Sequence, residues 1–500
     1  RAALQHLFGH VMLYPGFVSG SYESQSPFAD LEKTVNWYPE PIEPNSVPWS
    51  SALYPCPGFT EYVTVANINT RALFSMAGRV YAVIGNTVYQ VFANNTAVAV
   101  TNPTVANNPS PAQIASNGDA GGELLIASGT NGYLLTISSN TLTTIANLAG
   151  KCTMAGMIDG YFLAFDSSAS KFFISGLNDG TTWDATQYAQ RSIAPDPWKA
   201  MVVDGSRQIW LIGEQTGEVW YDAGTSPFPF APVPGAVFGY GTPAPFSVKL
   251  AGSTMCWLSQ TADGAGIVVG ATGVTPQRIS TYAVETAIAS YARDSIITDA
   301  EAVVYSEAGH TFYCLSFPSA NQTWVFDLTT GLWHQRGVWD DAAGDYDVWA
   351  PRNHCYGFGR HLIGDRTTGK LCTMDTSMTA ECDGTLMRRL RIPPPMFRAP
   401  GVRRMFVSRM ELVLESGLGT SSGQGSDPQV MLRSSINAKT WSNERLAAAG
   451  AAGAYNAQVV WTRLPSSVKM WVPEITVTDP IPWRIMGAEI DGRGFFGQEG

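Results

Sequence analysis

Charged side chains are scarce in this sequence. Asp, Glu, Lys and Arg make up 14% of its 500 residues, against about a quarter in ordinary soluble proteins. The formal net charge is −10 and the sequence isoelectric point is near 5.1. This balance argues against general affinity for nucleic acid, which rests on cationic neutralisation of phosphate. An acidic protein is still suited to surround DNA, because repulsion keeps a passing polyanion from sticking.

The common catalytic and metal-binding motifs are also absent. No HExxH or P-loop pattern occurs. His354, Cys355 and His361 are close in the chain, but their spacing fits no common metal site, and we interpret them as strand residues. Four aspartates in one Gly/Ala loop lack the spacing of a full calcium cage and are interpreted as solvated turn residues: Asp340, Asp341, Asp345 and Asp347. We therefore predict no catalytic, cofactor-binding or metal-binding residues, no cofactor and no enzyme activity.

No Cys-x-x-Cys pair occurs, and the seven cysteines are odd in number and scattered. We predict free, buried thiols in a reducing compartment, at Cys56, Cys152, Cys256, Cys314, Cys355, Cys372 and Cys382. The sequence shows no signal peptide and no apolar run long enough to span a bilayer. Because it begins with Arg1 rather than Met, we expect that a short leader is missing.

Glycine, proline and aromatic residues are abundant, and the apolar runs are short. The chain has 49 Gly, 31 Pro, 15 Trp, 19 Tyr and 22 Phe. This combination is typical of an all-β chain with many turns. Low charge with many aromatics also hints at large protein–protein contacts, and an ordinary, weakly charged surface is an equally good reading.

Pairs of apolar, β-prone runs joined by short Gly, Asn or Asp turns recur between residues 60 and 384. They start roughly 35 to 55 residues apart, the repeat range of propeller blades. We predict a β-propeller of six or seven blades, and a β-sandwich or two stacked barrels is the alternative. The paired runs are 79–84 with 87–91, 123–128 with 133–137, 160–165 with 171–175, 208–212 with 218–221, 254–258 with 266–269, 311–317 with 323–327, and 361–365 with 370–375.

One helix interrupts this pattern. Ala283, Val284, Ala287, Ile288 and Tyr291 recur at helical spacing, and the preceding Ser or Thr residue supplies an N-cap. This is the clearest helix signal in the chain.

The sequence changes character on both sides of the predicted propeller. Residues 1–59 are rich in proline, and we predict an extended arm without regular elements that packs on other domains or subunits. Residues 385–490 contain new strand-like runs around a Gly/Ser loop and predict a C-terminal β-sandwich-like domain. The Gly-rich residues 491–500 predict a flexible tail.

Arginines form the one basic concentration, at positions 388, 389, 391, 398, 403, 404 and 409. They are suited to phosphate, and still better suited to ion pairs with the acidic surface of a neighbouring domain or subunit. A second local feature, residues 434–441, resembles a degraded sialidase-type Asp box, in which Ile436 and Ala438 replace the Asp and Gly. Such boxes are structural hairpin turns and do not indicate catalysis.

Several stretches in shared order over some 450 residues resemble one family, the packaged-DNA stabilisation or tail nozzle (tail hub) proteins of short-tailed bacteriophages. No single motif is decisive. The stretches are 29–31, 34–40, 54–59, 256–259, 278–285, 323–327, 369–371, 453–455, 460–464, 478–480 and 487–488.

The resemblance implies a structural virion protein of the phage tail, assembled in the host bacterial cytoplasm. Six copies would form a ring below the portal and its adaptor ring. That ring would close and later conduct the exit channel for genomic double-stranded DNA, without sequence-specific binding, and would carry the needle or plug, fibres or tailspikes. The alternative is a carbohydrate-binding or sialidase-like propeller, either an adhesin or a glycosidase, because propellers host many functions.

Overall fold

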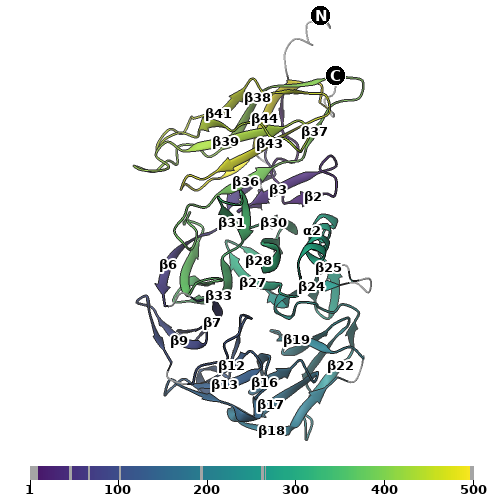
Figure 1. Ribbon diagram of the computed structural model, residues 1–500, viewed down its shortest axis with the longest axis vertical. Helices are drawn as coiled ribbons and strands as arrows, with labels where there is room; N and C mark the ends of the chain where they lie inside the picture. The colour runs from purple at the N-terminus through teal and green to yellow at the C-terminus, as the bar shows by residue number, and fades with distance from the viewer. Residues whose placement is uncertain are drawn as a thin grey trace, which may run out of the picture.

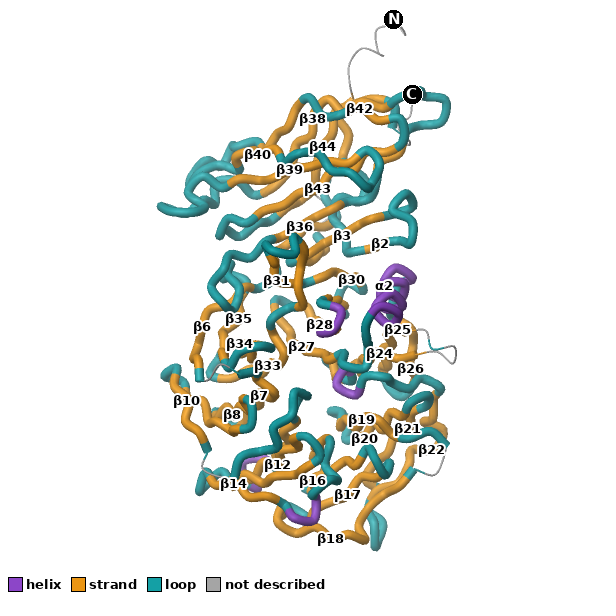
Figure 2. Tube along the Cα trace, viewed as in Figure 1, coloured by secondary structure: helices purple, strands orange, loops and turns teal. Residues whose placement is uncertain are grey.

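A ring of small antiparallel sheets occupies one end of the molecule, and two further sheets pack together at the other end (Figure 1). The computed structural model describes residues 10–43, 48–65, 68–100, 103–191, 195–260, 264 and 266–495. Figure 2 shows that strands dominate and that helices are few and short apart from α2. None of the helices formed by the described residues is long and apolar enough to cross a membrane.

The ring is a β-propeller, which confirms the predicted fold class. Six of its blades are separate four-stranded sheets, and a further four-stranded unit, β27–β30, takes a place in the same ring and continues into an eleven-stranded sheet. The blades are β7 (Thr70–Met76), β8 (Arg79–Ile84), β9 (Thr87–Phe92) and β10 (Thr96–Ala99); β11 (Gln113–Ser116), β12 (Glu123–Ser128), β13 (Asn131–Thr136) and β14 (Thr141–Thr144); β15 (Met154–Ile158), β16 (Tyr161–Asp166), β17 (Lys171–Gly176) and β18 (Asp179–Gln190); β19 (Trp198–Val203), β20 (Gln208–Gly213), β21 (Gly217–Asp222) and β22 (Phe230–Phe238); β23 (Lys249–Ala251), β24 (Thr254–Gln260), β25 (Gly266–Thr272) and β26 (Thr275–Arg278); β27 (Glu301–Glu307), β28 (His310–Phe317), β29 (Gln322–Asp327) and β30 (Leu332–Gln335); and β33 (Pro351–Gly357), β34 (Arg360–Asp365), β35 (Lys370–Asp375) and β6 (Gly58–Thr64).

Hydrophobic clusters fill the spaces between consecutive blades and run all the way round the ring. Tyr81 and Leu124, for example, belong to the cluster between the first two blades, while Val80 and Leu362 belong to the cluster that joins the last blade to the first. Central strands are therefore covered on both faces, which explains why β8 and β12 read as continuous apolar runs instead of alternating ones.

The ring is closed by a strand from the other end of the chain. β6 is the outer strand of the last blade and pairs antiparallel with β35, with Val63 opposite Leu371. Joining strands from the two ends of the propeller sequence in one blade makes opening of the ring cost the loss of a full strand pairing.

Two sheets form the C-terminal domain and enclose a core that includes Met410, Trp461, Trp471 and Ile490. One sheet has the order β4-β5-β44-β38-β41. The other is the far half of the eleven-stranded sheet, whose whole main path runs β27-β28-β29-β30-β3-β36-β43-β39-β40. This is the predicted sandwich. Its strands and those beside it are β1 (His10–Leu13), β2 (Tyr22–Glu23), β3 (Leu31–Val35), β4 (Trp37–Pro41), β5 (Ser51–Pro55), β31 (Gly337–Asp340), β32 (Asp345–Val348), β36 (Arg389–Ile392), β37 (Met396–Phe397), β38 (Met405–Leu414), β39 (Gln429–Ser435), β40 (Arg445–Ala448), β41 (Val459–Thr462), β42 (Ser466–Ser467), β43 (Met470–Val477) and β44 (Ile485–Arg493).

The expectation that prolines exclude regular elements from the N-terminal arm is wrong. The arm contributes β1 to β5, and β3 to β5 are built into the large sheets. Pro39 and Pro41 are tolerated because β4 is the edge strand of its sheet, so the missing N–H groups interrupt no second ladder. Pro55 is the last residue of β5.

The predicted flexible tail begins too early. β44 continues to Arg493 and pairs with β38, and Phe495 is buried against the sandwich core. Pairing and burial outweigh the flexibility that glycine gives to this stretch. Residues 496–500 lie outside the described residues.

The predicted helix is confirmed as α2 (Tyr282–Asp294), which begins after Thr281, whose side chain accepts the Val284 N–H. It packs Val284 and Ile288 against β25 and the neighbouring blade. The other helical pieces are α1 (Gly118–Gly121), η2 (Ala146–Leu148), η3 (Pro245–Ser247) and η4 (Pro318–Ala320).

Candidate functional site

The innermost strands of all seven four-stranded units surround a cavity of about 640 Å³ on the propeller axis. Asp204 is the only carboxylate among the described residues that line it. Its oxygens already accept hydrogen bonds from the backbone N–H groups of Ser206 and Gln208 and from the indole N–H of Trp210. A glycosidase needs a pair of carboxylates, or an equivalent nucleophile, facing one pocket. This cavity offers no such pair.

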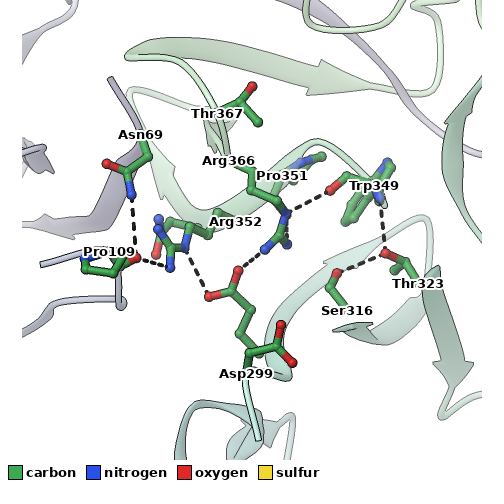
Figure 3. Close-up of polar contacts among 12 residues, drawn as sticks. Asn69, Pro109, Asp299, Ser316, Thr323, Trp349, Pro351, Arg352, Arg366 and Thr367 are labelled. Carbon is green, nitrogen blue, oxygen red and sulfur yellow. Dashed lines mark hydrogen bonds and ion pairs between the residues drawn. The ribbon is translucent and has the colours of Figure 1, made fainter. Parts of the chain in front are cut away.

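An ionic cluster in the wall of this cavity joins the last blades to the start of the ring. Figure 3 shows the guanidinium groups of Arg352 and Arg366 pointing toward one carboxylate, which is that of Glu301. The Arg352 Nε lies 3.0 Å from it, and Arg352 also donates a 2.6 Å hydrogen bond to the Pro109 carbonyl, which belongs to the loop between the first two blades. Burial lowers the pKa of both guanidinium groups to about 10, so both stay charged at neutral pH. The cluster therefore fixes three parts of the ring to one another.

The predicted strand histidines lie together without forming a metal site. His354 on β33 and His361 on β34 are cross-strand neighbours whose Nε2 and Nδ1 atoms are 2.9 Å apart, while Cys355 is buried. Burial lowers the pKa of His354 to about 4 and also lowers that of His361. Among the residues that the structure describes, no group of three His, Cys, Asp or Glu residues is arranged to hold a metal ion. His6 lies outside that part of the chain.

The four aspartates predicted as turn residues lie on the β31–β32 hairpin. Asp340 accepts the N–H of Ala342, and Asp341 accepts the indole N–H of Trp339 at 2.8 Å. Asp341 and Asp345 are exposed. All seven cysteines are buried and free, as predicted.

Folding divides the arginine cluster into two populations. Arg389 and Arg391 are fully buried, whereas Arg403 and Arg404 are exposed. Arg409 pairs with Glu411. The prediction that these residues pair with acidic groups of a neighbouring domain or subunit agrees with Arg391, which pairs with Glu32 of the arm, whereas Arg409 and Arg388 pair within the C-terminal domain.

Arg391 is the centre of the contact between the N-terminal arm and the C-terminal domain. Its side chain is 0% exposed and forms an ion pair with Glu32. Three arm carbonyl oxygens and one hydroxyl also accept hydrogen bonds from it: Gly16 O at 2.9 Å, Phe17 O at 2.7 Å, Gly20 O at 2.9 Å and Thr34 Oγ1 at 2.7 Å. Every N–H direction of the guanidinium fork is thus used to hold the arm in place.

Sequence reasoning missed two other buried joints. Asn36, in the left-handed region at φ 60°, donates to the carbonyls of Gly337 and Arg388 and so ties the arm to the exit of the propeller. Arg336 lies over the rings of three buried aromatic residues, Tyr305, Phe312 and Trp349, at 5.2, 4.8 and 5.0 Å. No local spacing in the sequence signals either joint, because the partners are far apart in the chain.

Comparison with solved structures finds distant β-structures. PorZ of Porphyromonas gingivalis is 12% identical with a TM-score of 0.39, and the alignment covers 70% of this chain and 44% of that one. The N-terminal domain of Nup159 is 10% identical with a TM-score of 0.37, covering 71% and 98%. BamB from Moraxella catarrhalis is 8% identical with a TM-score of 0.37, covering 74% and 97%. Among curated proteins, none matches this chain.

Comparison with protein families is more specific. The family described as "Bacteriophage P22 Gp10, beta-propeller" matches residues 17–379, and "Bacteriophage P22 Gp10, beta-sandwich" matches residues 395–493. The first segment contains the whole ring together with arm strands β3 to β5 of the large sheets, and the second contains β38 to β44 of the paired sheets. The chain therefore belongs to the bacteriophage P22 Gp10 family of phage tail proteins, with the propeller and the sandwich of that family in the same order.

Proposed function

We propose that this protein is the subunit of a hexameric tail hub, or nozzle, that sits below the portal–adaptor ring of a short-tailed phage. The hub closes the DNA exit channel after packaging and conducts the DNA on ejection. It also carries the needle or plug, fibres or tailspikes. The observation that carries this proposal is the match of both Gp10 family domains, in order, over most of the chain.

The charged groups of the interior fit a structural role. Arg391, Arg352 and Arg366 each bind a carboxylate and at least one backbone carbonyl, so their charges hold segments together. We accordingly propose that the protein has no enzyme activity. The carbohydrate-active alternative gains no support from the axial cavity, in which Asp204 is already saturated by hydrogen bonds.

The hub is proposed to act as a channel wall and not as a DNA grip. A net charge of −10 favours repulsion between the wall and the phosphate backbone, which lets DNA slide. The gate would then consist of loops or of an adjoining plug protein. Ordered phosphates in contact with an Arg- or Lys-lined bore, seen in a reconstruction of the tail, would contradict this part of the proposal.

Native mass spectrometry and negative-stain imaging of the purified full chain, alone and with tail extract, test the main proposal. We expect a six-membered ring that binds the extract's adaptor complex. A protein that stays monomeric under all these conditions and binds glycans saturably at micromolar concentration would instead support the carbohydrate-binding alternative.

A further inference from the structure

Four exposed arginines gather at one end of the sandwich, around the start of β38 and the end of β44. Arg404 immediately precedes β38, and Arg493 ends the neighbouring strand β44, where it lies opposite Phe406 with its guanidinium 4.9 Å from the ring centre. On the other side of β38, the Arg463 N–H donates to the Ser408 carbonyl. Together with Arg403 these residues form what we call the arginine patch: Arg403, Arg404, Arg463 and Arg493.

The arginine patch is uncompensated. Among the described residues, none of its four members forms an ion pair with a carboxylate, although acidic residues outnumber basic ones in the chain. Neighbouring like charges repel one another, so an isolated patch of this kind is stabilised when an anionic surface covers it. Guanidinium groups are also the side chains best suited to interface ion pairs.

A pocket of opposite character lies at the junction between the propeller and the sandwich. It has a volume of about 280 Å³ and is lined in part by Trp339, Asp341, Glu381, Asp383 and Thr478. We call it the acidic pocket. Its flanking carboxylates are exposed and belong to two different turns.

Glu381 makes this pocket more than a group of surface acids. The residue is 3% exposed, and neither carboxylate oxygen has a hydrogen-bond partner among the described residues. Burial raises the pKa of Glu381 to about 8, although the buried Arg389 acts in the opposite direction. Buried carboxyl oxygens without a hydrogen-bond partner are costly, and a cationic donor entering the pocket would satisfy them and favour the charged form.

One cation, Arg388, already lines the pocket and is held against one of its walls. Arg388 lies over the Trp339 ring at 4.1 Å, and its Nη2 is 3.7 Å from Glu444. A metal ion is disfavoured, because no described group of three acidic, Cys or His residues is close enough to hold one. The pocket is therefore suited to an organic cation with several N–H donors, which is the chemistry of an arginine side chain.

We propose that the acidic pocket accepts arginine side chains of the arginine patch from a second copy of this chain. The inference rests on the proposed ring. The patch lies beside the start of β38 and the end of β44, whereas the pocket lies between β31 and the turn that precedes β36, so the contact joins two different surfaces of the chain. A contact that joins two different surfaces leaves one patch and one pocket free at the ends of any open oligomer, and it closes into a ring when the rotation between successive copies divides a full turn, instead of building an open filament.

Charge reversal tests this contact on the full-length chain, with native mass spectrometry and light scattering as readouts. One variant carries Arg404→Glu and Arg493→Glu, and another carries Asp341→Lys and Asp383→Lys. We expect each to weaken assembly at least about tenfold while remaining folded by circular dichroism. The control, Arg207→Glu with Arg293→Glu, reverses exposed arginines elsewhere and is expected to assemble like the wild type.

Two further variants make the test specific. A chain carrying all four patch and pocket reversals exchanges both charges and is expected to regain the ring. A chain carrying only Glu381→Gln is expected to form the ring in part. Rings that persist in both one-sided variants, or a four-fold reversed chain that is folded but does not assemble, would overturn the contact while leaving the proposed hub intact. A patch variant that assembles normally but loses retention of duplex DNA would overturn it in favour of a phosphate-binding patch. A wild-type chain that stays monomeric overturns both this contact and the proposed ring.

Discussion

Replacing Arg391 with Met is expected to loosen the arm from the rest of the molecule. The substitution keeps an unbranched apolar stem but removes five hydrogen bonds, one of them to the Glu32 carboxylate. The site is fully enclosed, so water does not replace the lost donors freely. Glu32 in particular is left as a buried carboxylate without its cation.

The magnitude follows from this enclosure. Removing one partner of a buried ion pair costs roughly 3–5 kcal/mol, and each carbonyl left without a donor costs about 1–3 kcal/mol in isolation. Because these terms overlap at one site, we expect a total loss of about 4–6 kcal/mol in the free energy of unfolding. Adding Glu32→Gln removes the stranded charge and is expected to restore about 1–3 kcal/mol.

Urea unfolding followed by tryptophan fluorescence measures the effect, with limited proteolysis as a local readout. We expect new cleavage between residues 16 and 34, because this segment holds the acceptors of the lost hydrogen bonds. The matched control is Arg293→Met, at the exposed end of α2, which is expected to change stability by less than about 0.5 kcal/mol. A loss below about 1 kcal/mol for Arg391→Met would show that the arm is held by its strand pairing alone and would refute the reasoning.

Three further outcomes are expected. The seven cysteines should resist a thiol reagent such as DTNB in the native protein and all react after unfolding, since all are buried; reaction of any of them before unfolding contradicts the described packing. A hydrogen bond to Asp327, aided by Glu40, raises the pKa of His310 above its unfolded value, so its stabilisation is complete below about pH 6.5 and is lost as the pH rises through the folded-state pKa. Thermal melts from pH 6 to pH 9 should show this loss in the wild type and a flatter profile in His310→Gln. Thr281→Ala removes the N-cap of α2 and should cost about 1 kcal/mol in urea unfolding, whereas Thr281→Ser should cost little.

The parts of the fold that were predictable are those specified by neighbours in the chain. Blade hairpins such as β8–β9 are marked by two apolar runs around a tight turn, and α2 is marked by its apolar spacing and its Thr281 cap. These signals are local, because the turn residues and the period of the apolar residues lie within a few positions of one another. The blade repeat and the fold class followed from the same kind of evidence.

The parts that escaped prediction depend on partners far apart in sequence. β6 becomes a blade strand only because β35 lies beside it, some 300 positions later, and β4 tolerates its prolines only because it has an edge position. In the sequence Glu301 is indistinguishable from other acidic residues, because its partners Arg352 and Arg366 come close to it only when the ring closes. A single sequence carries no local sign of such pairings, since they arise from topology and not from periodicity.

The arrangement of sheets also restricts how this molecule moves. One eleven-stranded sheet runs from β27, beside the propeller axis, through β3 of the arm to β40 at the edge of the sandwich. Rotation of the sandwich against the propeller would break either the arm's contacts with the propeller, which are the β3–β30 pairing and the Asn36 bond to Gly337, or its contacts with the C-terminal domain, which are the β3–β36 pairing and the bonds of Arg391. Hinges are formed by a few connecting residues with little packing around them, and this junction is instead spanned by strands and by buried polar groups such as Asn36, whose side chain donates to Gly337 and Arg388. In a hub built from such subunits, opening of the channel is therefore expected to come from displacement between subunits, from loops or from a separate plug, and not from a hinge within the chain.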